Sequence, residues 1–195
     1  VAGPTENIKP LNVGILMFSE QPEKYFRYAR IEVVDIPDPT GTNMVEKVFS
    51  GPIQRQLKDA LLYIKNYTIK EAVIKTADKA EATRVVNYPY AAVEEILSNA
   101  VYHRSYQINE PITVRITGEG MEITSFPGFD RSITEKDIES YKIRARAYRN
   151  RRIGDFLKEL KLIEWRNTGY PNALKALKEN GSAYPEFKMD EDRSY

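Results

Sequence analysis

One helix, predicted over residues 90–104, constrains the fold of this chain more than any other segment. It begins after Pro89, and a proline costs little there because the first N–H groups of a helix have no partner within it. At 100° per residue, its apolar side chains fall on one broad arc. These side chains belong to Val93, Ile96, Leu97, Ala100 and Val101. An arc of this width predicts a helix packed on a sheet, and therefore a layered fold of helices and strands.

Polar side chains lie at the rim of that apolar arc, with Glu95 and Asn99 one helical turn apart. A carboxylate beside the core but reachable from outside can take a proton from a water molecule. An amide oxygen can hold a hard cation such as Mg²⁺. Surface helices often carry Glu and Asn at this spacing, so the pair taken alone is more typical of a solvated helix face.

The other periodic segments predict a mixture of helices and strands. Alternating residues predict strands at 31–36, within 67–87, at 112–117, 121–125 and 162–165. Helical spacing and end signals predict helices over 52–66, 134–141, 152–160 and 171–179. Thr134 and Asp137 are placed to cap the second of these helices. Residues 11–18 are too short and too uniformly apolar to decide between helix and strand.

The amino-acid composition excludes several classes of functional site. The 195 residues contain no cysteine and one histidine, His103. Disulfides, thiolate metal sites, cysteine nucleophiles and sites that need two imidazoles are therefore excluded. The net charge of +1 provides no overall attraction to nucleic acid. With no membrane-length apolar run and no signal peptide, we expect a soluble cytoplasmic protein without a membrane partner. Because residue 1 is valine, we also expect a piece of a longer chain.

The run Glu94-Glu95-Ile96-Leu97-Ser98-Asn99-Ala100-Val101-Tyr102-His103-Arg104-Ser105-Tyr106 resembles a known motif. It is similar to the E-x-x-x-N box of the gyrase/histidine-kinase (GHKL) ATPases. More closely, it resembles the E-A-x-x-N-A-x-x-H-R-D-Y segment of one bacterial and archaeal branch. Members of that branch join a Schlafen/AlbA-type domain to a GHKL-like domain, and are labelled transcriptional regulators or RecG-like ATP-dependent helicases.

Further segments resemble this branch in the same order. They are M-E-I-T-S-F-P-G-F-D-R-S-I-T, Arg149-Asn150 before a helix ending L-K-L-I-E, and Asn167-Thr168-Gly169-Tyr170-Pro171. Upstream, N-x-G-I-L-M-F-S and F-S-G-P-I-x-x-Q-L resemble the end of the AlbA-type module and its connector. The resemblance implies an α+β fold. We expect a degenerate GHKL (Bergerat-type) two-layer α/β sandwich over 86–195, preceded by a small α/β connector and AlbA-type remnant over 1–85.

The resemblance also assigns site residues. It implies that Glu95 activates water and that Asn99 binds Mg²⁺ and nucleotide. It places Ser125, Pro127 and Gly128 in the loop near the adenine, and Thr168 and Gly169 in the turn that holds phosphates. Backbone N–H groups at a helix N-terminus suit anions, which agrees with the last assignment. The implied cofactors are ATP and Mg²⁺.

The sequence departs from the family pattern at several of these positions. No acid precedes Gly128, although Asp130 follows it, and Ser105 replaces the family aspartate after His-Arg. The phosphate turn has one glycine, although close approach of backbone to phosphate favours several. We therefore expect nucleotide binding to be weak or lost, and at most a weak ATPase. The chain has no G-x-x-x-x-G-K-[ST] loop, so a helicase motor is unsupported.

A basic run with interleaved tyrosines follows the short helix at 134–141. Its arginines are Arg144, Arg146, Arg149, Arg151 and Arg152. The run is interpreted either as a patch that contacts the phosphates of nucleic acid or nucleotide, or as an ordinary solvated loop. Separately, residues 153–165 resemble the helix and first strand of a winged-helix module, which would read DNA directly.

The favoured interpretation is an ATP-binding regulatory module of a DNA-associated transcriptional regulator, with hydrolysis weak or absent. One alternative is a non-catalytic interaction module that keeps the fold and has lost the nucleotide. Another is direct DNA binding through the arginine run or the winged-helix-like segment. A homo-oligomer is compatible with the sequence, which does not specify the DNA target or the regulatory partner.

Overall fold

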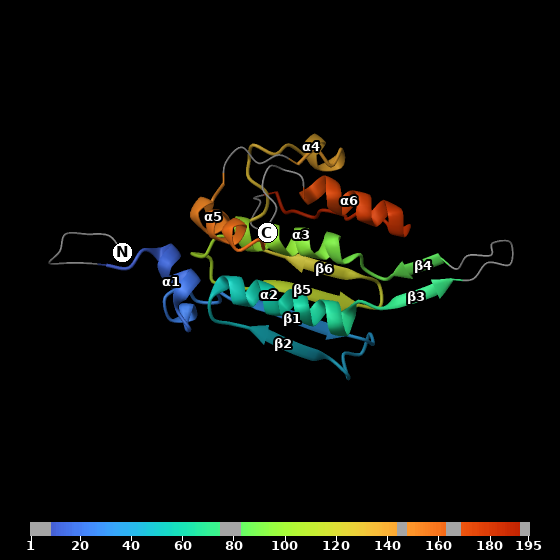
Figure 1. The fold of residues 1–195 in the computed structure, drawn as a ribbon, viewed down its shortest axis with the longest axis horizontal. Coiled ribbons are helices and arrows are strands. Elements are labelled where there is room, and N and C mark those ends of the chain that lie inside the picture. Colours follow the sequence, from blue (N-terminus) through green and yellow to red (C-terminus); the bar gives the residue numbers. More distant parts are fainter. Residues whose placement is uncertain (1–8, 75–82, 144–147, 163–168, 192–195) are drawn as a thin grey trace.

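A four-stranded mixed sheet forms one layer of the molecule (Figure 1). The computed structural model describes residues 9–74, 83–143, 148–162 and 169–191. The strands are β1 (Ile31–Ile36), β2 (Val45–Phe49), β5 (Ile112–Thr117) and β6 (Met121–Thr124), in the spatial order β2-β1-β5-β6. β1 pairs in parallel with β5, whereas β2 and β6 pair antiparallel to their neighbours. The α+β sandwich predicted from the sequence is confirmed.

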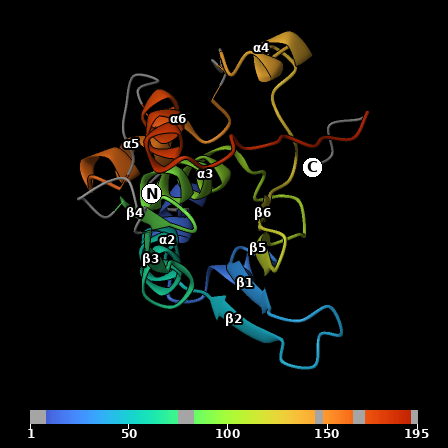
Figure 2. The same ribbon diagram turned by 90° about the vertical axis from the view of Figure 1, so that its right-hand side faces the viewer.

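The helices form the second layer. They are α1 (Asn12–Phe18), α2 (Ile53–Tyr63), α3 (Tyr90–His103), α4 (Glu135–Glu139), α5 (Arg151–Glu159) and α6 (Gly169–Asn180). Short 3₁₀ and π segments, Pro22–Lys24 and Ile64–Thr68, complete the helical elements. α2 and α3 cover one face of the sheet, and α5 and α6 lie against α3 (Figure 2). A separate hairpin, β3 (Glu71–Ile74) with β4 (Thr83–Val86), projects from one end of the molecule (Figure 1).

Alternation along the two central strands sorts side chains between the two faces of the sheet. Ile31 and Val33 on β1 are buried toward the helices, as is their neighbour Val114 on β5. Glu32 and Arg115 alternate with them and therefore point to the opposite, polar face. In the described part of the chain, one face of this sheet is packed and the other is polar, as is common where antiparallel pairs form the edges.

The residue-85 boundary expected from the sequence runs through one sheet and one core. β1 and β2 precede it, β5 and β6 follow it, and the parallel pairing of β1 with β5 joins them. One hydrophobic cluster extends from Leu16 in α1 to Leu157 in α5. The division into residues 1–85 and 86–195 stays a prediction, with the two parts in direct contact through this sheet.

Two buried amides connect parts of the chain that lie far apart in sequence. Gln56 of the Q-L motif is 3% exposed and donates from Nε2 to the carbonyls of Ala29 and Gly51. Asn180, at the end of α6, makes reciprocal hydrogen bonds of 2.7 and 2.9 Å with the backbone of Val86. Both side chains satisfy backbone groups that have no partner in a helix or sheet, and so they fix the ends of these elements.

Most of the predicted elements are present, with shifted ends. Within residues 11–18, which periodicity left undecided, Asn12–Phe18 form helix α1. Thr134 and Asp137 cap α4 reciprocally, as predicted. The predicted strand at 162–165 falls mostly outside the described residues, and Leu162 itself is not in a strand. No helix in the described part of the chain is long and apolar enough to cross a membrane.

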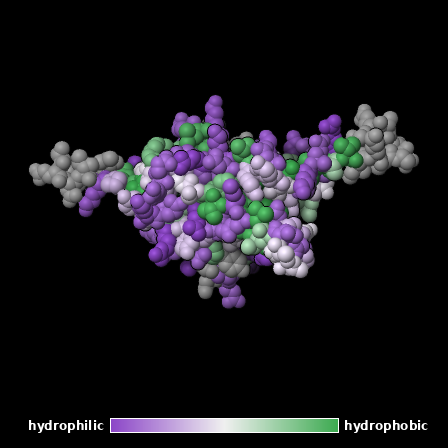
Figure 3. All heavy atoms as spheres, turned by 90° about the horizontal axis from the view of Figure 1, so that it is seen from below, coloured by the Kyte–Doolittle hydropathy of each residue, from purple (hydrophilic) through white to green (hydrophobic). Residues whose placement is uncertain are grey.

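Strand β2, at one edge of the sheet, is not among the strands predicted from the sequence. Its side chains are mostly exposed, and Glu46 and Lys47 interrupt the apolar pattern between Val45 and Val48. Charges on an edge strand discourage pairing with another chain. Seen from below, the molecule is largely hydrophilic, with small and separate apolar spots (Figure 3).

Gly154 in α5 allows that helix to approach α3 closely. A methyl group at this position would lie 2.6 Å from Cζ and 2.9 Å from Oη of Tyr102. The Tyr102 ring is 6% exposed and stacks on Tyr148 with ring centroids 5.5 Å apart, so it has little room to move. Gly14 in α1 has open space around it and provides a matched control.

We predict that Gly154→Ala lowers the free energy of unfolding by roughly 1–3 kcal/mol, because the overpacking outweighs the helix propensity gained. Gly14→Ala should leave that free energy unchanged or raise it by up to about 1 kcal/mol. Urea denaturation followed by circular dichroism measures both variants. Equal effects of the two substitutions would contradict the close packing of α5 on α3.

Candidate functional site

The candidate site is built on the polar rim of α3, where Glu95 and Asn99 are both half-buried. Nδ2 of Asn99 donates a hydrogen bond to Oε1 of Glu95 over 2.8 Å. The opposite rim of the same helix is closed by packing, with Leu97 and Val101 at most 1% exposed. With its Nδ2 directed at Glu95, the Asn99 amide has Oδ1 as the atom able to coordinate a cation.

The Pro-Gly loop follows β6 and contains Ser125, Pro127 and Gly128, all half-buried. The backbone N–H of Ser105 donates to the carbonyl of Phe126 over 2.7 Å, which fastens this loop to the end of α3. Directly after the loop, Oδ1 of Asp130 accepts the N–H of Ser132 over 2.9 Å. Asp130 therefore stabilises the turn that leaves the loop.

The start of α6 reaches the same side of α3. Gly169 begins the helix, and the hydroxyl of Tyr170, one residue later, is buried without a hydrogen-bond partner among the described residues. Burial raises the pKa of Tyr170, and nearby Tyr141 and Glu95 raise it further. The phenol is therefore protonated at neutral pH and remains able to donate a hydrogen bond.

His103 continues the polar rim one turn beyond Asn99. Its ring lies 4.6 Å from that of Tyr102 and 5.9 Å from that of Tyr148, measured between centroids. Burial lowers the pKa of His103; nearby Asp130 opposes this shift and Arg149 adds to it. His103 is therefore neutral at pH 7, and its ring packs against Tyr148 in the segment before α5.

Arg104 and its neighbours in the His-Arg-Ser-Tyr run are structural. Arg104 is 2% exposed and donates to the carbonyls of Tyr28 over 3.2 Å and Glu110 over 2.6 Å. Its guanidinium lies 4.7 Å from the ring centroid of Tyr106, whose hydroxyl donates to the carbonyl of Val101. Burial lowers the pKa of Arg104, but an arginine keeps its charge under all ordinary conditions.

Asn150, the second residue of the Arg-Asn motif, also has a structural role. Its Nδ2 donates to the carbonyl of Tyr102 over 2.9 Å and to that of Arg104 over 2.6 Å. These carbonyls belong to the end of α3, where the helix has no further N–H groups to donate to them. Asn150 thereby joins the start of α5 to the end of α3.

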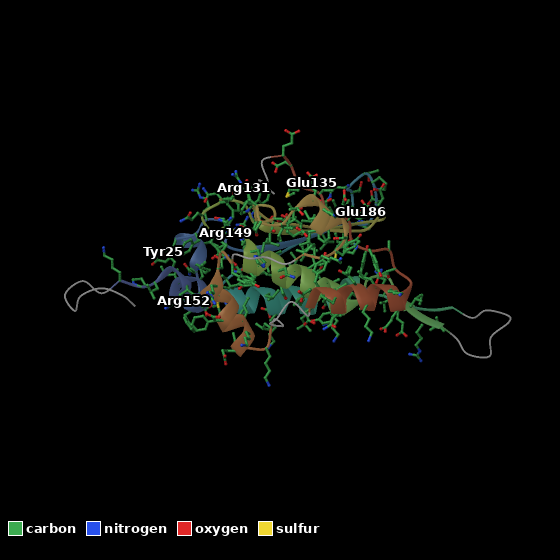
Figure 4. The ribbon with its side chains drawn as sticks, turned by 90° about the horizontal axis from the view of Figure 1, so that it is seen from above. Tyr25, Arg131, Glu135, Arg149, Arg152 and Glu186 are labelled. Atoms are coloured by element: carbon green, nitrogen blue, oxygen red, sulfur yellow. The ribbon has the colours of Figure 1, made fainter. Side chains whose placement is uncertain are left out.

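The described part of the basic run is exposed. Arg149, Arg151 and Arg152 are all exposed at the start of α5. Viewed from above, Arg131, Arg149 and Arg152 lie toward the α5 end of the molecule (Figure 4). Glu135 and Glu186 lie on the other side of the view, near α4 and the C-terminal segment (Figure 4). Arg144 and Arg146 lie outside the described residues.

The structure thus brings most of the predicted nucleotide residues to one side of α3. Glu95 lies near the start of α6, and His103 lies near Asp130 at the end of the Pro-Gly loop. Thr168 of the expected phosphate turn lies outside the described residues. The described residues contain no cluster of three or more His, Cys, Asp or Glu side chains that could hold a metal ion. A Mg²⁺ bound here would therefore need ligands from its nucleotide and from water, in addition to Asn99.

Residues 109–194 match a family model described as "Putative ATP-dependent DNA helicase recG C-terminal". This match supports an ATPase-like domain of the RecG-like, GHKL type over those residues. The matched range includes the Pro-Gly loop and the start of α6. It begins after α3, so Glu95 and Asn99 lie outside it. The Schlafen/AlbA-type origin of the upstream residues stays a prediction.

The crystal structure of the DIP2311 protein from Corynebacterium diphtheriae has a similar fold. The TM-score is 0.67 and the sequence identity is 24%, over 92% of this chain and 35% of that chain. The present chain therefore spans about a third of that protein, and the likeness shows the fold alone. No curated protein matches the chain.

The sequence analysis missed an aromatic cluster beside the predicted site. Phe129, Tyr141 and Tyr170 surround Phe187 of the C-terminal segment. These residues come from four separate segments, so no local spacing connects them. The sequence gives one hint of this cluster: Gly128 and Gly169 are each followed directly by an aromatic residue.

Arg104→Lys should lower the free energy of unfolding by about 1–3 kcal/mol, because one amine cannot reach both carbonyls and leaves a buried acceptor without its donor. Arg30→Lys is the matched control, since Arg30 also lies over a tyrosine ring but is 31% exposed and pairs with Glu32. The control should change the free energy of unfolding by less than about 1 kcal/mol. Chemical denaturation compares the two. A similar, small effect for both would show that Arg104 is not the buried connector described.

Proposed function

We propose that this chain is an ATP-binding regulatory module of a DNA-associated transcriptional regulator, with Mg²⁺ as cofactor and hydrolysis weak or absent. The observation that carries the proposal is the Glu95–Asn99 pair on α3. The pair is half-buried and lies on the side of the helix that faces the start of α6. The family match over residues 109–194 supports the same type of domain.

In this proposal each part of the site has a separate task. Asn99 coordinates Mg²⁺ through Oδ1, and Glu95 holds the amide in the orientation that presents this atom. Backbone N–H groups at the start of α6 would hold phosphate, and the Tyr170 hydroxyl, which has no partner among the described residues, would be a further donor. The Pro-Gly loop contacts the base.

Two features support weak hydrolysis. Glu95 already accepts a hydrogen bond from Asn99, so part of its capacity to accept a proton from water is used. Asp130, the acid nearest to the loop, is occupied in a turn with Ser132. A site of this kind suits sensing of a nucleotide better than repeated turnover.

A second candidate function is DNA binding, and the exposed arginines favour it. Arg149, Arg151 and Arg152 follow one another closely at the start of α5, and Arg131 lies toward the same end (Figure 4). Such a cluster suits phosphate contacts, which weaken steeply as salt concentration rises. This function is compatible with nucleotide binding at α3, because the two surfaces are formed by different residues.

The direct test is calorimetric titration of the protein with a non-hydrolysable ATP analogue, with and without Mg²⁺. For Asn99→Ala we expect the dissociation constant to rise about tenfold or more, since one metal or hydrogen-bond contact to a charged group contributes roughly 1.5–3 kcal/mol. Removal of Mg²⁺ should weaken binding to the wild type but change little in the variant. This loss of Mg²⁺ dependence identifies Asn99 as a ligand, because the two perturbations then act on one interaction.

Asn43→Ala is the matched control, because Asn43 is an exposed asparagine between β1 and β2. It should bind the analogue as the wild type does, with the same Mg²⁺ dependence. Equal binding by Asn99→Ala and wild type would contradict the assignment of Asn99. No binding to any variant at millimolar analogue would contradict the proposed function.

A further inference from the structure

The C-terminal segment after α6 crosses the candidate nucleotide site. Its path is fixed where it leaves α6, because the N–H of Ser182 donates to the carbonyl of Leu177 and the amide of Asn180 donates to Oγ of Ser182. Beyond that point, none of residues 183–189 forms a backbone–backbone hydrogen bond with another described residue. The segment is therefore placed by its side chains and by single contacts.

Tyr141 is one of those contacts. Its hydroxyl donates to the carbonyl of Pro185 over 3.1 Å, and its ring meets that of Tyr184 edge-on with centroids 5.4 Å apart. Tyr141 immediately follows the last turn of α4. The segment therefore passes beside α4, in agreement with the position of Glu186 near α4 (Figure 4).

Phe187 is the main contact. Its ring centroid lies 5.4 Å from that of Phe129, 5.8 Å from that of Tyr170 and 6.3 Å from that of Tyr141. These separations are in the range of favourable aromatic pairs. Phe129 adjoins Gly128 of the Pro-Gly loop, and Tyr170 adjoins Gly169 at the start of α6. Phe187 thus touches the two parts of the candidate site that would hold the base and the phosphates.

The ring cluster is separate from the structural core. Among the described residues, neither hydrophobic cluster includes any of its four rings, and Phe187 is only half-buried. A half-buried ring on a segment without backbone pairing can leave without opening the core. Phe129, Tyr141 and Tyr170 would then present three aromatic surfaces, with the buried Tyr170 hydroxyl beside them as an unused donor.

We propose that Phe129, Tyr141 and Tyr170 form a binding site for a planar aromatic ring, such as the purine of a nucleotide, and that Phe187 occupies it as an intramolecular competitor. This inference rests on the proposed function, and it adds the position of the base and a way to regulate access to it. Phe187 lies seven residues after Asn180, where the segment is anchored. A tether this short keeps the competitor at an effective concentration on the order of millimolar.

Competition predicts a specific pattern of ligand affinity. If the occupied state outweighs the open one about tenfold, the apparent dissociation constant of a ring ligand rises by about the same factor. Phe187→Ala should therefore bind adenosine and the ATP analogue about tenfold more tightly than the wild type does. Phe187→Tyr, which restores a ring, should bind them as the wild type does. Tripolyphosphate, which has phosphates but no ring, should bind both variants and the wild type equally.

A second measurement needs no substitution. The NMR ring signals of Phe187 in the wild type should move toward those of an exposed phenylalanine when adenosine is added, because the ligand displaces the ring from the cluster. Phe18→Ala is the control for loss of an aromatic ring elsewhere, since Phe18 is 67% exposed on α1. It should change neither the affinity for adenosine nor the shift of the Phe187 ring signals that adenosine causes.

The outcomes separate this inference from the proposed function. Equal affinity of wild type and Phe187→Ala for the ATP analogue, with Phe187 ring signals that do not move when adenosine is added, would overturn the competitor and leave nucleotide binding intact. If Phe187→Ala tightened the binding of tripolyphosphate as much as the binding of adenosine, the proposed competition would also be overturned. The segment would then cover the phosphate site rather than the ring site. No binding of any nucleotide to wild type or variant would overturn both proposals.

Discussion

Burial of α3 on several sides is the constraint on which the rest of this structure depends. Leu97 and Val101 face the core beneath the helix, and Ala92 packs against Ala173 and Leu177 around α6. Asn150 and Tyr102 close its C-terminal end against α5. Ala92 lies two turns before Asn99 on the same face of the helix, so α6 packs along the side of α3 that contains Glu95, Asn99 and His103. The Pro-Gly loop and the start of α6 meet this side, so packing of the helix also determines the geometry of the candidate site.

This arrangement makes two polar motifs structural, and our proposal assigns the third to ligand binding. Arg104 and Asn150 both donate to backbone carbonyls, two hydrogen bonds each, and so connect elements of the fold. Glu95 and Asn99 are bonded to each other and remain half-buried. A motif shared with a nucleotide-binding family can therefore contain residues with entirely different tasks, and burial together with partner identity distinguishes them.

Sequence patterns anticipated the parts of the fold that local physics determines. The apolar arc of α3, the hairpin of β5 and β6, and the Thr134–Asp137 cap depend on neighbours within a few residues, and all are present. β2 was missed because its exposed, charged side chains do not alternate in the expected way. The parallel pairing of β1 with β5 joins strands about 80 residues apart, so no local signal predicts it.

The candidate site was anticipated in the same uneven way. Helical spacing places Glu95 and Asn99 together on α3, and the family resemblance predicts their roles, but the rings around Phe187 come from four segments and meet only in the folded chain. The C-terminal segment has no periodic pattern, and its position depends on single contacts with Tyr141 and with the ring cluster. Affinity for nucleotide would therefore depend as much on the segment that covers the site as on the residues that form it.

The most direct test of the central claim is amide and side-chain NMR of the wild-type protein, titrated with Mg²⁺ and a non-hydrolysable ATP analogue. The account predicts chemical-shift changes at Glu95 and Asn99, at the Pro-Gly loop, at Tyr170 and at Phe187, with the ring signals of Phe187 shifting as it leaves the cluster. Shift changes confined to Arg149–Arg152, with α3 and Phe187 unaffected, would place the ligand on the basic surface instead. That result would contradict a nucleotide site on α3.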